Sequence, residues 1–131
     1  MGPRLLLVED EPELLQALRV RLSAAGFICE TASNGKEALA CLARQRPDLI
    51  IADLVMPEMD GYEMVERVQS DQRTASIPVI VLTAVPEYAF DRRAAQLHPA
   101  RIMHKPFESE HLVSAVRSLV GPQASGGPRD G

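Results

Sequence analysis

Four short apolar runs in this chain each end at a side chain able to take part in polar chemistry. The runs are residues 5–8, 49–52, 79–82 and 102–104. They are followed by an acidic pair, a lone carboxylate, a hydroxyl and an ammonium, at Glu9 and Asp10, Asp53, Thr83 and Lys105. In an open parallel α/β sheet, ligands bind outside the carboxyl ends of the strands. We therefore expect these groups to meet in one crevice.

Helical patterns separate the apolar runs. Strands are predicted at residues 5–8, 27–31, 49–52, 77–82 and 100–104. Helices are predicted to begin near residues 11, 34, 60, 86 and 108 and to end near residues 26, 46, 70, 97 and 120. Strands that alternate with helices imply a doubly wound α/β fold with a parallel sheet and right-handed crossovers. The continuously apolar third and fourth strands indicate helices on both faces.

The length of 131 residues fits one domain. We expect it to occupy residues 1–120, and residues 121–131, which are rich in Gly, Pro and polar side chains, to form a flexible tail or linker. The N-terminus has no signal-peptide pattern, and no apolar run approaches the roughly 20 residues needed to cross a bilayer. A cytoplasmic protein with no membrane contact is therefore predicted. Cys29 and Cys41 lack metal-ligand spacing and are expected to be free thiols.

The net charge of −4 argues against direct nucleic-acid binding. Such binding depends on basic side chains that replace the counterions of phosphates. Any contact with DNA would have to come from a partner or from another domain.

Asp53 is the best candidate for a phosphoryl acceptor. A carboxylate with a reference pKa of about 3.9 is ionised at neutral pH and can attack phosphorus without a general base. The obstacle is charge, because Glu9 and Asp10 are also negative and so is the phosphoryl group. Mg²⁺ prefers oxygen ligands and would remove this repulsion. Phosphoryl transfer also needs positive charge and donors around the equatorial oxygens. Lys105 and Thr83, with the backbone N–H that follows Thr83, can supply them.

These motifs resemble those of the response-regulator receiver domains of two-component signalling. The matching segments are residues 7–12, 53–61, 82–84 and 105–107, and the resemblance extends from residue 4 to about residue 120. It implies a flavodoxin-like fold with five parallel strands in the order 2-1-3-4-5, helices on both faces and a cis Lys105–Pro106 peptide.

The resemblance also implies the roles of the site residues. Asp53 would accept phosphate from a histidine kinase or a histidine phosphotransfer protein. Mg²⁺ would be held by Glu9, Asp10, Asp53 and the carbonyl of Val55. Thr83, the N–H of Ala84 and Lys105 would hold the phosphoryl group.

The output implied by the resemblance is a switched protein surface. That surface would be the face formed by the helices at 86–97 and 108–120 and the strand at 100–104. It would bind a downstream target or a fused output domain, in a monomer or a weak dimer. Such a protein is not a conventional enzyme, since it catalyses only its own phosphorylation and slow autodephosphorylation.

The main departure from the family pattern is at residue 102. Ile102 occupies a position where the family often has a Tyr or Phe that swings inward. Without that aromatic side chain, phosphorylation would be signalled by a shift of Thr83 and of the neighbouring helix surface. Val55 and Val85 offer no hydrogen bond to a hydrolytic water, so self-dephosphorylation is expected to be slow.

Three alternatives stay open. A phosphatase with an aspartyl-phosphate intermediate, similar to the haloacid dehalogenases, would need a second acid where this chain has Val55. A flavodoxin-like cofactor binder would need a phosphate loop in place of the acidic residues 9–12. A receiver that only docks, without phosphorylation, would be expected to lack one of the required side chains, and none is missing.

Overall fold

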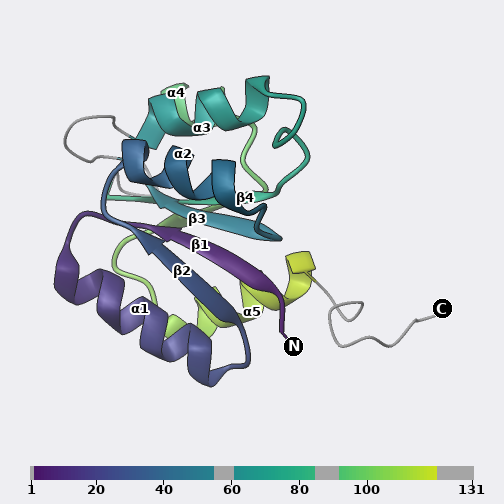
Figure 1. Ribbon diagram of the computed structural model, residues 1–131. Helices are drawn as coiled ribbons and strands as arrows, with labels where there is room; N and C mark the ends of the chain where they lie inside the picture. Colours follow the sequence, from purple (N-terminus) through teal and green to yellow (C-terminus); the bar gives the residue numbers. More distant parts are fainter. Residues whose placement is uncertain (1, 55–60, 85–91, 121–131) are drawn as a thin grey trace, which may run out of the picture.

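The computed structural model describes residues 2–54, 61–84 and 92–120 (Figure 1). The strands are β1 Arg4–Val8, β2 Ile28–Ala32, β3 Leu49–Asp53, β4 Val79–Thr83 and β5 Arg101–His104. The helices are α1 Pro12–Ala24, α2 Gly35–Arg44, α3 Gly61–Ser70, α4 Arg92–Ala95 and α5 Ser109–Val120. The predicted alternation of strands and helices is confirmed.

All strand pairs in the sheet are parallel, and the strand order is β2-β1-β3-β4-β5. This is the order that the sequence resemblance implied. Figure 1 shows α1 and α5 on one face of the sheet and α2 and α3 on the other. The order reverses between β1 and β3, which is the point at which folds of this type bind their ligands.

The sheet divides the hydrophobic core into two layers. Successive side chains of a strand point to opposite faces, so Leu5 and Leu7 pack with α1 and α5 while Leu6 and Val8 pack with α2 and α3. The same alternation holds along β3 and β4. A continuous apolar strand is therefore required, because both of its faces are covered.

Local signals determine where helices begin and end. The side chain of Asn34 accepts a hydrogen bond of 2.8 Å from the N–H of Glu37, and Glu37 in turn accepts one from the N–H of Ser33. This reciprocal cap begins α2. After α1 the chain reverses at Gly26, whose φ of 103° is a conformation that side chains disfavour.

Some boundaries differ from those predicted. β4 begins at Val79 instead of residue 77. Pro78 lacks an N–H to pair with, and the N–H of Ile77 closes a turn with the carbonyl of Thr74. The described part of the helix expected at 86–97 is α4, which ends at Ala95, and residues 86–91 lie outside the described residues.

The described part of the chain contains no helix that combines the length and apolar character needed to cross a bilayer. Cys29 and Cys41 are free, as expected. The expected tail at 121–131 lies outside the described residues.

Candidate functional site

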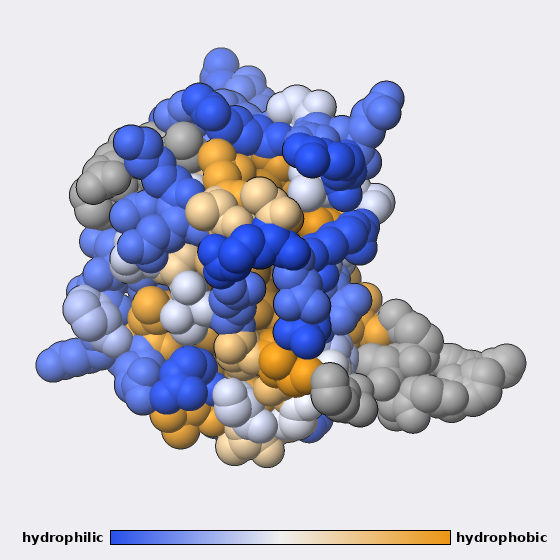
Figure 2. Space-filling view, in the orientation of Figure 1, coloured by the Kyte–Doolittle hydropathy of each residue, from blue (hydrophilic) through white to orange (hydrophobic). Residues whose placement is uncertain are grey.

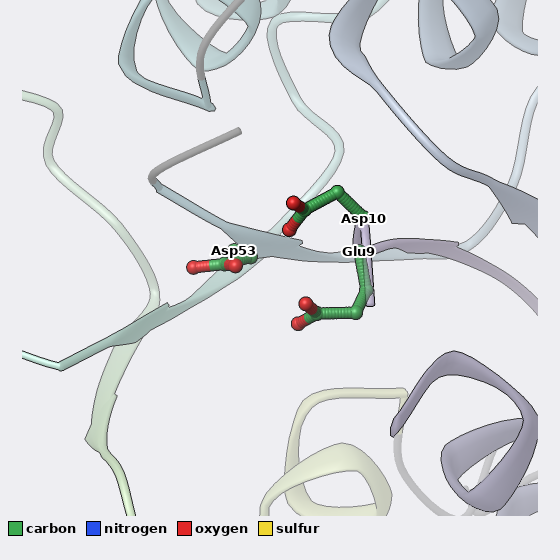
Figure 3. Close-up of side chains that lie close together, drawn as sticks. All are labelled: Glu9, Asp10 and Asp53. Atoms are coloured by element: carbon green, nitrogen blue, oxygen red, sulfur yellow. The ribbon is translucent and has the colours of Figure 1, made fainter. Parts of the chain in front are cut away.

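Three carboxylates meet where β1 and β3 end. Glu9 and Asp10 follow β1 directly, and Asp53 is the last residue of β3. One oxygen from each carboxylate can be chosen such that all three lie within 4.8 Å of one another. Figure 3 shows Glu9 and Asp10 extending from the end of β1 toward the side on which Asp53 lies. The sequence prediction that these acids meet at one edge of the sheet is confirmed.

The register of the sheet explains this meeting. Val8 pairs with Ala52 across β1 and β3, so the next residue of each strand, Glu9 and Asp53, emerges at the same level. The N–H of Glu9 also donates to the carbonyl of Ala32 at 3.1 Å, which extends the ladder toward β2 by one bond. Backbone pairing therefore holds both acids at the strand-order reversal.

Glu9 is almost fully enclosed, with 1% of its surface exposed. Burial and the nearby Asp53 carboxylate raise the pKa of Glu9 from 4.5 to about 7, although the N–H of Glu11 and the ammonium of Lys105 oppose the rise. The N–H of Glu11 donates to Oε2 of Glu9 at 3.2 Å. Two buried acids held this close repel each other, and a cation between them would relieve that repulsion.

Lys105 reaches the cluster from the end of β5. Its Nζ lies 3.5 Å from Oε1 of Glu9 and 3.5 Å from Oδ2 of Asp53. Burial disfavours the charge of Lys105, but the two carboxylates outweigh it and raise the pKa of the ammonium. Lys105 therefore stays charged at neutral pH, beside the carboxylate of Asp53.

Thr83 completes the row of strand ends. It is the last residue of β4, 4% exposed, and its carbonyl accepts a 2.8 Å hydrogen bond from the N–H of Lys105. That bond fixes the end of β5 against the end of β4. The Lys105–Pro106 peptide is cis, in agreement with the resemblance. Ala84, whose N–H was expected to contact phosphate, is exposed just beyond Thr83.

Two residues discussed in the sequence analysis lie in segments that the structure does not describe. Val55, whose carbonyl was expected to bind the metal, lies outside the described residues, as does Val85. The described chain resumes at Gly61, whose N–H donates to the carbonyl of Leu54 at 2.9 Å.

Gly61 is a site residue whose role the sequence interpretation missed. A Cβ placed on Gly61 would lie 2.1 Å from the carbonyl oxygen of Asp53 and 2.6 Å from Cα of Leu54. Only glycine allows α3 to begin this close to the end of β3. The Asp60-Gly61 pair that closes the Asp53 motif was the available signal, but it indicated only a turn.

The donor set fits a small hard divalent cation. All three groups are carboxylates, the ligands that Mg²⁺ prefers, and Glu9 and Asp53 are buried while Asp10 is partly open. Mg²⁺ usually keeps several waters and binds through a few protein oxygens. Glu9, Asp10 and Asp53 are therefore the residues that would hold such an ion.

The sequence profile of the response regulator receiver domain family matches residues 5–117. The DNA-binding dual master transcriptional regulator RpaA of Synechocystis is 32% identical to this chain over 118 residues. That match covers 90% of this chain and 49% of RpaA. The chain spans about half the length of the curated relatives it matches.

Solved structures are similar over almost the whole chain. The receiver domain of a signal transduction histidine kinase from Syntrophus aciditrophicus matches with a TM-score of 0.84 and 34% identity, covering 99% of this chain and 96% of that one. The receiver domain of sensor histidine kinase PA1611 from Pseudomonas aeruginosa matches with a TM-score of 0.84 and 26% identity, covering 92% and 98%. That structure holds a magnesium ion in its active-site cleft.

Proposed function

The chain belongs to the response regulator receiver domain family of two-component signalling, and from this premise we propose that it accepts a phosphoryl group on Asp53 in a Mg²⁺-dependent reaction. The donor would be the phosphohistidine of a histidine kinase or a histidine phosphotransfer protein. The observation that carries the proposal is the meeting of Glu9, Asp10 and Asp53 with one lysine ammonium at the same strand ends.

The proposed step is a displacement at phosphorus. A carboxylate oxygen of Asp53 forms the new P–O bond as the P–N bond of the donor breaks, and the bonding electrons leave with the imidazole. No proton has to be removed from the nucleophile, because Asp53 attacks as a carboxylate. A bound Mg²⁺ would lower the repulsion between the carboxylates and the phosphoryl oxygens.

The remaining residues align the group and balance its charge. Lys105 offers a fixed positive charge next to Asp53, at the 3.5 Å separation described above. Thr83 and the N–H of Ala84 would donate to phosphoryl oxygens. Because the carbonyl of Thr83 accepts the N–H of Lys105, any movement of Thr83 toward the phosphoryl group would be transmitted to the end of β5.

The output surface would be the face formed by α4, β5 and α5. The ends of β4 and β5 connect this face to the site, and Ile102 leaves 36% of its surface exposed there. Phosphorylation would then favour one of two arrangements of this face that already interconvert. The bound target would be a separate protein or a fused output domain, in the cytoplasm and without direct contact of this domain with nucleic acid or membrane. The domain itself would span residues 1–120 and be a monomer or a weak dimer.

The phosphatase alternative predicts turnover of a phosphoester, and the docking alternative predicts no covalent change. Incubation with acetyl phosphate and MgCl₂ followed by intact-mass measurement separates them. We expect a gain of about 80 daltons, the mass of one phosphoryl group, that disappears in Asp53→Asn or in EDTA. The matched control is Asp71→Asn, which removes a partly exposed carboxylate away from the cluster and should leave the gain unchanged.

Steady release of p-nitrophenol from p-nitrophenyl phosphate, without accumulation of phosphoprotein, would overturn the proposal in favour of a phosphatase. An unchanged mass in the wild-type protein would overturn it in favour of a docking module.

A further inference from the structure

A basic groove lies between α2 and α3, where both helices end. Its volume is about 470 Å³. Its lining residues come from the C-terminal parts of the two helices and from the loops that follow. Those used below are Leu39, Leu42, Arg44, Arg46, Arg67 and Arg73. Figure 2 shows hydrophobic surface enclosed by strongly hydrophilic residues on this side of the molecule.

The groove concentrates positive charge on an acidic protein. Four arginines and a single acid, Asp71, line it, and two further acids outside the lining, Glu30 and Glu63, pair with Arg44 and Arg67. The whole chain has 14 basic and 18 acidic side chains and a net charge of −4. A local excess of positive charge is therefore not a consequence of overall composition.

The arginine heads are held in place before any ligand binds. Arg46 donates to the hydroxyl of Ser76 at 2.7 Å and to the carbonyl of Arg73 at 3.3 Å. Arg73 donates to Oδ2 of Asp71 at 2.9 Å through its guanidinium. Such preorganisation lowers the entropy cost of binding a partner.

Stabilisation of the helix ends accounts for only two of the four arginines. Arg44 ends α2 and Arg67 lies in the last turn of α3, where cations favour the negative end of the helix dipole. They also pair with Glu30 and Glu63 respectively. Arg46 and Arg73 lie beyond the helix ends, and neither of the partners of Arg46 described above carries a negative charge.

The floor of the groove is apolar. Leu39 and Leu42 are partly buried and pack against the core layer on this face of the sheet. A phosphate or another small anion would use the arginines and leave these leucines uncovered. A segment that combines carboxylates with aliphatic side chains would satisfy both, because guanidinium groups bind carboxylates in a two-pronged geometry.

We propose that this groove docks an acidic segment of a partner protein, with carboxylates on the four arginines and an aliphatic side chain against Leu39 and Leu42. Nucleic acid is another polyanion that four arginines could bind. The domain's net negative charge and the leucine floor favour a protein segment over nucleic acid.

The groove is a second site, separate from the phosphoacceptor. Its loops lead into the beginnings of β3 and β4, whereas the carboxylate cluster and Thr83 stand at the ends of β1, β3 and β4. The proposal thus goes beyond the proposed function and does not depend on it. It can be tested on unphosphorylated protein and on Asp53→Asn.

The probe is an acetylated hexapeptide of alternating glutamate and leucine, titrated into ¹⁵N-labelled protein without Mg²⁺. We expect saturable shifts of backbone amides confined to residues 39–46 and 67–74. Binding should weaken when NaCl is raised from about 20 mM to about 300 mM, because exposed charges are screened.

Two variants test the arginines separately. Arg46→Gln and Arg67→Gln should each weaken peptide binding by about tenfold, the loss expected for one charge-assisted contact. Within residues 2–54, 61–84 and 92–120, Arg67 forms an exposed i,i+4 ion pair with Glu63, so its replacement should cost little stability. The matched control is Arg101→Gln, because Arg101 also donates to a serine hydroxyl, that of Ser118 at 3.4 Å, but lies outside the groove.

Three kinds of result would overturn the proposal. The first is an absence of shifts in the groove amides, or binding that both groove variants retain. The second is equal binding of a glutamine-leucine peptide, or of inorganic phosphate, since neither reproduces the expected recognition. The third is tighter binding of a single-stranded oligonucleotide at the same amides, which would assign the groove to nucleic acid.

Discussion

Gly61 and Asp53 are in such close contact that a single methyl group on Gly61 would lie 2.1 Å from the carbonyl oxygen of Asp53. The start of α3 is thereby held against the last residue of β3, and the side chain of that residue is the proposed phosphoacceptor. The obstructing atoms are backbone, which cannot move aside by a change of rotamer. Substitution of Gly61 must therefore shift either the helix or the strand end.

Gly61→Ala should lower the free energy of unfolding by about 1–3 kcal/mol, as overpacking does, and should slow labelling of Asp53 by acetyl phosphate. Urea unfolding and a mass-based time course measure the two effects. Gly26→Ala is the control: it forces a side chain to φ 103° with nothing within 4 Å. It should cost about 1 kcal/mol but leave the labelling rate unchanged. Equal slowing in both variants would contradict a local role for Gly61.

The pKa of Glu9 predicts how stability depends on pH. Its pKa of about 7 in the fold exceeds the ordinary value of 4.5, so between these values the folded state binds more protons than the unfolded chain. Stability of the metal-free protein should therefore fall as pH rises from 4.5 to 7. Urea unfolding in EDTA across this range should show the fall in the wild-type protein and a weaker dependence in Glu9→Gln.

Glu37 supplies a control of opposite sign. Hydrogen bonds from the backbone and hydroxyl of Ser33 lower the pKa of Glu37. The stability that ionised Glu37 contributes is present above the ordinary carboxyl pKa range. It is lost as pH falls through the lowered pKa of Glu37. Glu37→Gln should therefore leave the fall between pH 4.5 and 7 intact. If Glu37→Gln removes that fall and Glu9→Gln does not, the interpretation of Glu9 is wrong.

Lys105→Met should have opposite effects on metal binding and on phosphorylation. The ammonium lies 3.5 Å from oxygens of both Glu9 and Asp53, so it repels a divalent cation held by the same acids. Its removal should tighten Mg²⁺ binding by about threefold or more, while labelling of Asp53 should become slower. Calorimetric titration with MgCl₂ and the mass assay test the two effects. Lys36→Met changes an exposed lysine of α2 and should alter neither.

His98 is the one non-glycine residue in the described part of the chain with a positive φ, at 52°. A side chain pays a steric penalty in this region and a β-branched one pays more. His98→Gly should therefore be more stable than the wild type and His98→Val less stable. The free energies of unfolding, measured by heat or urea, should span about 1–2 kcal/mol. The side chain of His98 is exposed, which limits other consequences of the change. A Val variant as stable as the Gly variant would contradict the backbone argument.

The sequence predicted the positions of β1, β3 and β4 because these inner strands are covered on both faces and must be continuously apolar. The edge strands β2 and β5 are only partly buried and carry polar residues, so their apolar signal is weaker. The sequence predicted the strand ends less well, since hydrogen-bond partners determine them. Ala100 was expected in the last strand, but its N–H pairs with the carbonyl of Val79 just before β5 begins at Arg101. Glu108 was expected as the first residue of the last helix, but it instead accepts the N–H of Leu112 and precedes α5.

The carboxylate cluster was predictable because strand ends in a parallel sheet share one edge, so position along the chain implies position in space. The groove arginines gave no such signal. Arg46 and Arg73 lie in separate loops, and only the packing of α2 beside α3 brings them together. The contact of Gly61 with Asp53 was hidden for a related reason, because an Asp-Gly pair indicates a turn without showing which backbone lies opposite.

β3 connects the two proposed sites. Its five residues begin at Leu49, just after the loop that carries Arg46, and end at Asp53. At about 3.3 Å per residue, such a strand spans about 13 Å, so one rigid segment separates the groove from the phosphoacceptor. A phosphodonor and a docked acidic segment could thus bind at opposite ends of β3 at the same time. The domain could then form the middle of a three-protein assembly, in which one neighbour delivers phosphate while the other stays attached.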